Sequence, residues 1–201
     1  MAKPLTDDAL RKLFLDARSH NRFTDRDIDE TVLRQLIDVT KMGPTSANCS
    51  PARVVFVKSE SAKQRLIPLL SQGNRDKTKS APVCAIIGED LAFYDHLGQL
   101  FPHIDARSWF FDADGEPLEA KIDETAFRNA TLQGAYLMIA ARALGLDCGP
   151  MSGFDSEGVT KEFFGGTRIR ANFLCNLGYG DESALFERSP RFKFEEMASI
   201  I

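Results

Sequence analysis

Apolar residues recur along this chain at two spacings, which separate helical segments from strands. Between residues 6 and 17 they fall three or four positions apart, and this predicts a helix that Thr6 caps. A second amphipathic helix is expected from about Asp29 onward, because four apolar residues there share one face. The pair Gly43 and Pro44 stops that helix.

Short β-branched runs and longer helical patterns alternate through the rest of the chain. The expected strands are residues 53–58, 82–88 and 171–179. The expected helices are residues 60–70, 124–144, 155–164 and a stretch after Arg191, with a polar loop over residues 71–80. The pattern over 124–144 is apolar around much of its circumference, so it is expected to be the central buried helix, closed by Gly145.

Residues 90–117 mix aromatic, histidine, proline and glycine residues without a clear period. We expect this segment to be a lid-like excursion of short helices and loop. The order of the other elements predicts an α+β fold, with three or four core strands in a small central antiparallel or mixed sheet flanked by helices. With 201 residues, the chain is expected to form a single domain over residues 1–201.

Composition excludes several classes of function. The net charge of −4 argues against a broad nucleic-acid interface, and no apolar run approaches the ~20 residues of a membrane span. The start of the chain has no apolar leader segment, so a cytoplasmic location is expected. Cys49, Cys84, Cys148 and Cys175 are far apart and show no metal-ligand spacing with the histidines, so we expect buried free thiols and no metal.

The chain lacks the glycine-rich fingerprints of Rossmann and P-loop nucleotide sites, and it lacks the G-x-S-x-G motif of hydrolases. Ligand-binding or catalytic residues are expected instead in three polar segments, which are residues 17–23, 43–51 and 147–154.

In the first polar segment (residues 17–23), Arg18 and Arg22 flank a serine and could clamp a phosphate, because a guanidinium offers a planar fork of donors. The competing interpretation is a helix C-terminus with cations placed against its dipole. Arg188 and Arg191 add two guanidiniums in a segment that would otherwise be a plain surface loop.

The second polar segment (residues 43–51) and the third (residues 147–154) are rich in small residues. Small residues let the backbone approach a flat ligand closely, and the Thr, Ser and Asn side chains of the second segment could bond ring heteroatoms. The competing interpretation is an ordinary turn in each case.

Together these segments resemble the FMN-dependent nitroreductase family over nearly the whole chain. The matching motifs are Arg18-Ser19 with Phe23, GPTSAN at 43–48, ALGL at 143–146, GPMSG at 149–153, and Gly178-Tyr179 followed by Arg188 and Arg191. Within the family, the segments GPTSANCSPAR, LFPHIDARSWF, ETAFRNA, ALGLDCGPMSGF and LGYGD look like those of members that reduce malonic semialdehyde in pyrimidine degradation.

The resemblance implies a nitroreductase-like fold and an intertwined homodimer with FMN at the subunit interface. It also implies the residues that bind FMN, with Arg188 or Arg191 joining the first two at the phosphate. They are Arg18, Ser19, Asn21, Pro44, Thr45, Ser46, Asn48, Gly149, Pro150, Met151, Ser152, Gly153, Arg188 and Arg191. Asn21 departs from the family pattern, since many relatives carry an arginine there, and Arg22 is an alternative phosphate contact.

The resemblance further implies a two-step reaction, in which flavin N5 accepts a hydride from NADH or NADPH and then delivers it to a second substrate. If that substrate is malonic semialdehyde, its carboxylate needs a cation and its aldehyde oxygen needs a donor. The candidates are His103 and Arg107, with Trp109 as an apolar cover, and the competing interpretation is a surface loop with an ordinary Arg–Asp pair.

Two other functions stay open from the sequence. One is a broad-specificity nitroaromatic or quinone reductase, and the other is a flavin-binding protein without turnover. No residue that would read the ribose of NADH or NADPH is identifiable, so the sequence does not choose between these two reductants.

Overall fold

A four-stranded antiparallel sheet forms the centre of the computed structural model, which describes residues 3–201. Its strands lie in the order β1 (Ala52–Val57), β2 (Val83–Asp90), β4 (Ile169–Gly178) and β3 (Asp147–Met151). The expected small antiparallel sheet is confirmed, and β3 is a strand that the sequence pattern missed. Pro150 obscures it, but β3 is an edge strand, where a proline does not break the ladder.

Residues 3–201 contain eight α-helices and several short helical turns. The helices are α1 (Asp7–Leu10), α2 (Glu30–Thr40), α3 (Glu60–Leu66), α4 (Gln72–Ser80), α5 (Leu97–Leu100), α6 (Glu119–Ala143), α7 (Ser156–Phe164) and α8 (Phe194–Met197). A π-helical turn (Arg11–Leu15) follows α1, and 3₁₀ turns occur at Ser46–Asn48, Ile67–Leu69, Phe93–His96, Arg107–Phe110 and Glu182–Ala184.

Local signals account for several helix boundaries. Thr6, Asp29 and Asp155 each accept a hydrogen bond from a backbone N–H two or three residues further on, as N-caps do. Gly145, with a φ of 83°, lies just beyond the C-terminus of α6, where only glycine adopts this conformation without strain.

Residues 71–80 are helical, so the prediction of a polar loop there is wrong. The segment has no apolar stripe, and its helix α4 is held by polar contacts to distant parts of the chain. Thr78 is fully buried, and Asn74 Nδ2 donates to the carbonyl of Gly153 at 2.9 Å. The central helix α6 also begins at Glu119, five residues before its predicted start at Glu124.

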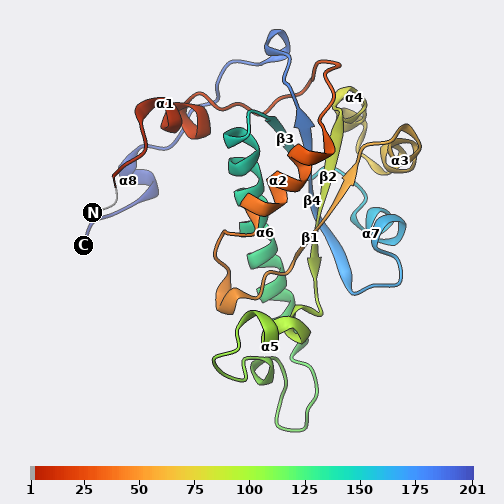
Figure 1. Ribbon diagram of the computed structural model, residues 1–201, viewed down its shortest axis with the longest axis vertical. Helices are drawn as coiled ribbons and strands as arrows, with labels where there is room; N and C mark the ends of the chain where they lie inside the picture. Colours follow the sequence, from red (N-terminus) through yellow and green to blue (C-terminus); the bar gives the residue numbers. More distant parts are fainter. Residues whose placement is uncertain (1–2) are drawn as a thin grey trace.

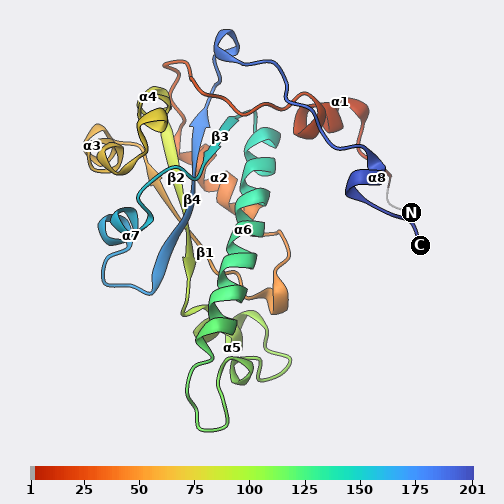
Figure 2. The same cartoon turned by 180° about the vertical axis from the view of Figure 1, so that it is seen from behind.

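The molecule has three layers, which Figures 1 and 2 show from opposite sides. Helices α6 and α2 cover one face of the sheet, and α3, α4 and α7 lie on the other. Every residue of β2 is buried between these layers. One core cluster joins the sheet to α2 and α6, and a second joins it to α3 and α7. The expectation of a central buried helix is therefore only partly met, because α6 buries one face in this core but leaves Phe127, Leu132 and Tyr136 exposed.

Residues 91–118 form an excursion at one end of α6 and pack around a core of their own (Figure 1). Phe93, Leu97 and Phe110 are buried there against Ile122 of α6. The segment consists of short helical turns and loop. That it acts as a lid remains a prediction.

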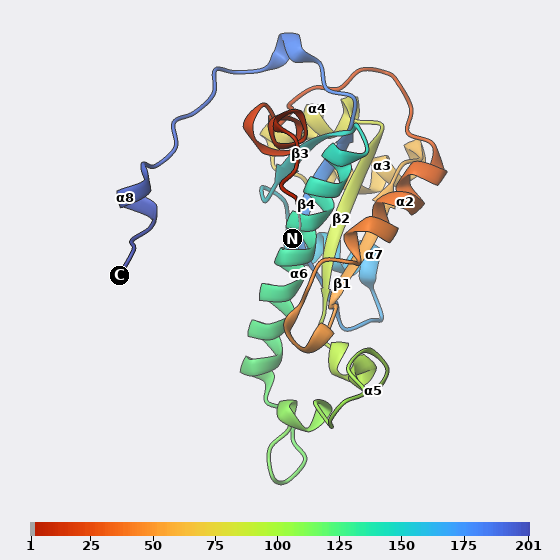
Figure 3. The ribbon, with the colours of Figure 1, turned by 60° about the vertical axis from the view of Figure 1, so that its left-hand side comes forward.

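The C-terminal arm, residues 185–201, extends away from the rest of the molecule and carries α8 (Figure 3). It exposes many large apolar side chains. These are Phe186, Phe192, Phe194, Met197, Ile200 and Ile201. No helix within residues 3–201 combines the length and apolarity that crossing a bilayer requires.

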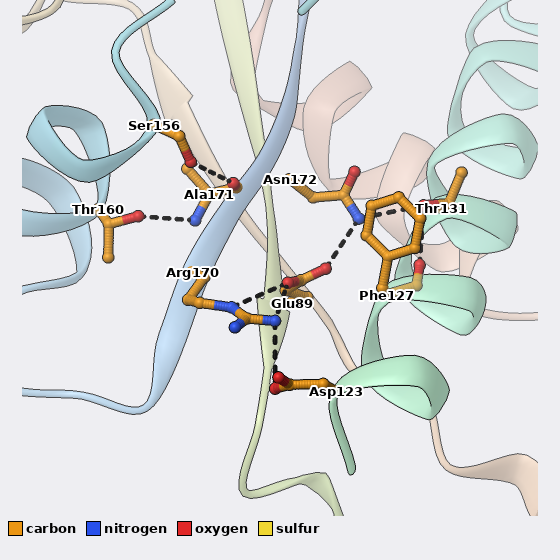
Figure 4. Close-up of polar contacts among 9 residues, drawn as sticks. All are labelled: Glu89, Asp123, Phe127, Thr131, Ser156, Thr160, Arg170, Ala171 and Asn172. Carbon is orange, nitrogen blue, oxygen red and sulfur yellow. Dashed lines mark hydrogen bonds and ion pairs between the residues drawn. The ribbon is translucent and has the colours of Figure 1, made fainter. Parts of the chain in front are cut away.

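A charged network joins the sheet to α6 (Figure 4). The Glu89 side chain is only 5% exposed, and its Oε1 accepts two hydrogen bonds from Arg170, at 3.0 and 2.8 Å. Its Oε2 accepts a bond of 3.1 Å from Asn172, and Arg170 also pairs with Asp123 of α6 at 3.3 Å. Both oxygens of this buried carboxylate are therefore satisfied.

Candidate functional site

The residues expected to hold a phosphate surround one cavity of about 620 Å³. The first polar segment forms one wall and the start of the C-terminal arm forms another, although they are about 170 positions apart in the sequence. The predicted residues on its lining are Arg18, Ser19, Asn21, Arg188 and Arg191.

The arginines of this cavity carry no neutralising partner. Arg18, Arg188 and Arg191 donate to backbone carbonyls, and none of them forms an ion pair with any acid in residues 3–201. Glu187 is the one acidic residue on the cavity's lining. The cavity therefore has a surplus of guanidinium donors, which suits a phosphate monoester.

Arg22, the alternative phosphate contact, is occupied elsewhere. Its Nε bonds Asp181 at 2.7 Å and its Nη2 bonds Ser183 at 2.9 Å. Hydrogen bonds from Ser183 and from Arg22 hold the pKa of the Asp181 carboxyl below its usual value. Arg22 thus joins the first polar segment to the turn after β4 and is absent from the cavity's lining.

Sequence reasoning missed Arg142, which also lines the cavity. It comes from the last turn of α6, which was expected to be a buried apolar helix. The sequence does hold one signal for Arg142, which is the only charged residue in the apolar run AYLMIAARAL.

The third polar segment lies beside the first. Ser19 pairs with Cys148 in an isolated β-bridge, and the His20 backbone N–H donates to the Cys148 carbonyl at 2.9 Å. A Cβ on Gly149 would lie 2.5 Å from the His20 carbonyl oxygen, so only glycine permits this approach. Gly149, Pro150 and Met151 belong to β3, and Ser152 and Gly153 form the turn that follows it.

The second polar segment has a strained backbone. Ala47, Asn48 and Ser50 have φ values of 47°, 51° and 40°, a region that non-glycine residues rarely occupy. Contacts with other elements hold it there. The Ser46 N–H donates to Asn129 Oδ1 at 2.8 Å, and Asn48 Nδ2 donates to the Leu100 carbonyl at 2.8 Å. Strain of this kind persists only where the surroundings impose it, and it clusters at ligand sites.

The second polar segment lies outside the cavity. It is anchored at Asn129 of α6, whereas the cavity touches the same helix at Arg142. These residues are thirteen positions apart, which is about 20 Å along a helix that rises ~1.5 Å per residue. The structure thus brings the first and third polar segments together and leaves Pro44, Thr45, Ser46 and Asn48 beside the middle of α6, outside the cavity.

The candidate substrate contacts lie in the excursion at the N-terminal end of α6. Arg107 Nε pairs with Asp95 at 3.3 Å, and its guanidinium carbon lies 4.3 Å from the centre of the Phe111 ring. The rings of His103 and Trp109 lie around Phe101, at 5.3 and 6.5 Å between centroids. The Arg107 side chain is 51% exposed, so its ion pair is a weak, solvated one.

All four cysteines are buried free thiols, as expected. Burial raises the pKa of Cys49 to about 11 and that of Cys84 to about 12, so both stay protonated at neutral pH and are poor nucleophiles. Within residues 3–201 no group of His, Cys, Asp or Glu side chains is arranged to hold a metal ion.

Comparison of the sequence with known protein families identifies the class to which this chain, with its α+β fold and arginine-lined cavity, belongs. Residues 15–179 match the model of the nitroreductase family. The chain belongs to the nitroreductase family.

Similar proteins extend this result over the whole chain. A Burkholderia lata protein is 61% identical over 196 residues, which are 98% of each chain, and it is named a NADH dehydrogenase/NAD(P)H nitroreductase. A Ralstonia pickettii protein of the same description, HadB, is 53% identical over 96% of this chain and 97% of its own.

Solved structures show the same fold at low identity. A Bacillus subtilis structure described as a nitroreductase has a TM-score of 0.84 at 19% identity, over 98% of this chain and all of its own. An Exiguobacterium sibiricum structure, described as a nitroreductase in complex with FMN, has a TM-score of 0.81 at 18% identity over the full length of both chains. The predicted nitroreductase-like fold is confirmed.

Proposed function

We propose that this protein is an FMN-dependent NAD(P)H oxidoreductase that works as a homodimer in the cytoplasm. The observation that carries the proposal is the cavity of unpaired arginines in a chain of the nitroreductase family. The names of the similar proteins support NADH or NADPH as the reductant, and the described FMN complex of a protein with the same fold supports the cofactor.

The residues present fit FMN. Arg18, Arg188 and Arg191 would bind its phosphate, with the Ser19 hydroxyl as a further donor. Gly149, which has no Cβ, lets the third polar segment pack closely against the backbone of His20, next to the residues that line the cavity. Bound FMN would supply the redox chemistry, taking up a hydride from NAD(P)H and passing it to a second substrate.

The homodimer is proposed because a single protomer separates the two halves of the expected FMN site. With the phosphate in the cavity, the five-carbon ribityl chain is too short to carry the ring system about 20 Å to the second polar segment. The same segment of a second protomer can meet the ring instead. The exposed apolar side chains of the C-terminal arm support this, because a protomer on its own would leave them in water.

For the second substrate we propose malonic semialdehyde, reduced to 3-hydroxypropionate in pyrimidine degradation. Support comes from the segments LFPHIDARSWF and ALGLDCGPMSGF and from the full-length similarity to HadB. Arg107 would bind the substrate carboxylate in competition with Asp95, while His103 would bind the aldehyde oxygen and Trp109 would exclude water. The exposed Arg107–Asp95 pair is weak enough for a substrate to displace.

The first experiment purifies the protein and identifies the released flavin. We expect a yellow protein that NADH or NADPH bleaches and an acceptor recolours, and comparison of the two reductants gives the preferred one. A protein that binds FMN but is not bleached would be a flavin-binding protein without turnover. A colourless protein that takes up no FMN would contradict the proposal.

The second experiment compares malonic semialdehyde with a nitroaromatic and a neutral quinone. A broad-specificity nitroaromatic or quinone reductase is the second candidate function, favoured by the names of the similar proteins. We expect kcat/KM to be highest for the semialdehyde. Arg107→Ala should raise KM for the semialdehyde and spare the quinone, which has no carboxylate to lose. Equal losses on both would assign Arg107 a structural role.

A further inference from the structure

Arg142 lines the phosphate cavity but belongs to helix α6, outside all three polar segments. It lies in the last turn of α6 and lines the same cavity as Arg18, Arg188 and Arg191. Its Nη1 donates to the Leu13 carbonyl at 3.0 Å. Its Nε is buried and has no hydrogen-bond partner within residues 3–201.

A structural role explains only part of this arrangement. A cation in the last turn of a helix is stabilised by the helix dipole, and the bond to Leu13 ties the π-helical turn after α1 to α6. Neither interaction satisfies the Nε proton. Buried donors on charged groups are nearly always paired, because leaving one unpaired costs the full desolvation penalty. No carboxylate within residues 3–201 forms an ion pair with Arg142 to compensate.

We propose that Arg142 is a phosphate-binding residue of this cavity, in addition to the three arginines near the chain termini. This inference rests on the proposed function, and it names a contact that comes from the central helix. Arg142 donates to a phosphate oxygen of the ligand and keeps its Nη1 bond to Leu13. In the proposed dimer each α6 would then contribute to two FMN sites, because it also holds the second polar segment of its own protomer through Asn129.

The test compares two ligands that differ only in the phosphate. Dissociation constants of FMN and riboflavin are measured by fluorescence quenching on the flavin-free protein, for the wild type and for Arg142→Gln. Glutamine is neutral and its amide nitrogen reaches only to the position of the arginine Nε, so this variant removes both the charge and the bond to the Leu13 carbonyl. We expect FMN binding to weaken about tenfold or more, the size of one charge-assisted hydrogen bond, while riboflavin binding changes less than about twofold.

Two further variants separate charge from structure. Arg142→Lys keeps the charge without the planar fork and should lose only part of the FMN affinity. Arg128→Gln is the matched control, because Arg128 lies on the same helix, is 66% exposed and pairs with Glu124 away from the cavity. It should bind both ligands as the wild type does. The thermal midpoint of each flavin-free variant reports on folding, and if Arg142→Gln does not fold, Arg142→Lys carries the comparison.

The outcomes are distinguishable. Equal weakening of FMN and riboflavin by Arg142→Gln would mean that the side chain only holds Leu13, and the inference would be overturned. Unchanged FMN affinity in Arg142→Gln, together with a loss in Arg18→Ala, would overturn the inference and leave the proposed function standing. A wild-type protein that binds FMN no better than riboflavin would contradict both.

Discussion

The buried Glu89 carboxylate gives the sharpest prediction about stability. Arg170→Met removes its two shortest hydrogen bonds and leaves it with Asn172 alone (Figure 4). Stranding one charge of a buried pair costs about 3–5 kcal/mol. The Arg170 side chain is 44% exposed, so water can enter the vacated space, and we expect a reduced loss of about 2–3 kcal/mol in the free energy of unfolding.

The reasoning predicts that a second substitution rescues the first. Adding Glu89→Gln to Arg170→Met removes the stranded charge, so the double variant should be more stable than Arg170→Met alone by about 1 kcal/mol or more. Urea unfolding of the wild type, Arg170→Met and the double variant at one protein concentration measures this, since the proposed dimer would make stability depend on concentration. Arg128→Met is the exposed control and should cost at most about 0.5 kcal/mol. A double variant no more stable than Arg170→Met would refute the reasoning.

Three other predictions follow from the site and the arm. Arg18→Ala should weaken FMN binding by about 1.5–3 kcal/mol, or about tenfold or more, and an unchanged affinity in a fluorescence titration would remove its phosphate role. Ending the chain at Arg191 removes most of the exposed apolar side chains of the arm, so sedimentation should show a shift from dimer to monomer, whereas a full-length monomer with bound FMN would argue against the dimer. Burial raises the pKa of Cys49 from 9.0 to about 11, so the unfolded chain ionises first and stability should fall as pH rises through this range. Cys49→Ala should flatten that fall in urea midpoints measured from pH 7.5 to about 10.5, and an identical slope in both proteins would contradict it.

Much of this fold is encoded locally and could be predicted from the sequence. The caps at Thr6, Asp29 and Asp155 bond backbone groups only two or three residues away, so the sequence near each cap decides it. The apolar periods of α2 and α6 and the β-branched runs of β1, β2 and β4 likewise depend on neighbouring residues. The three polar segments were visible because small and polar residues interrupt these periods.

Other features depend on contacts between residues far apart in the sequence, so only the tertiary structure decided them. Helix α4 has no apolar stripe and is held by Asn74 and the buried Thr78, and β3 is a strand because β4 pairs with it. The path of the chain brings Arg18 to Arg188 and places Arg142 beside both. It also puts the second polar segment beside the middle of α6, away from Arg142, because different parts of a long rigid helix contact different segments. The apolar period of an element shows which of its sides faces the core. It does not show which distant segment packs against that element, and this packing decides which residues form the site.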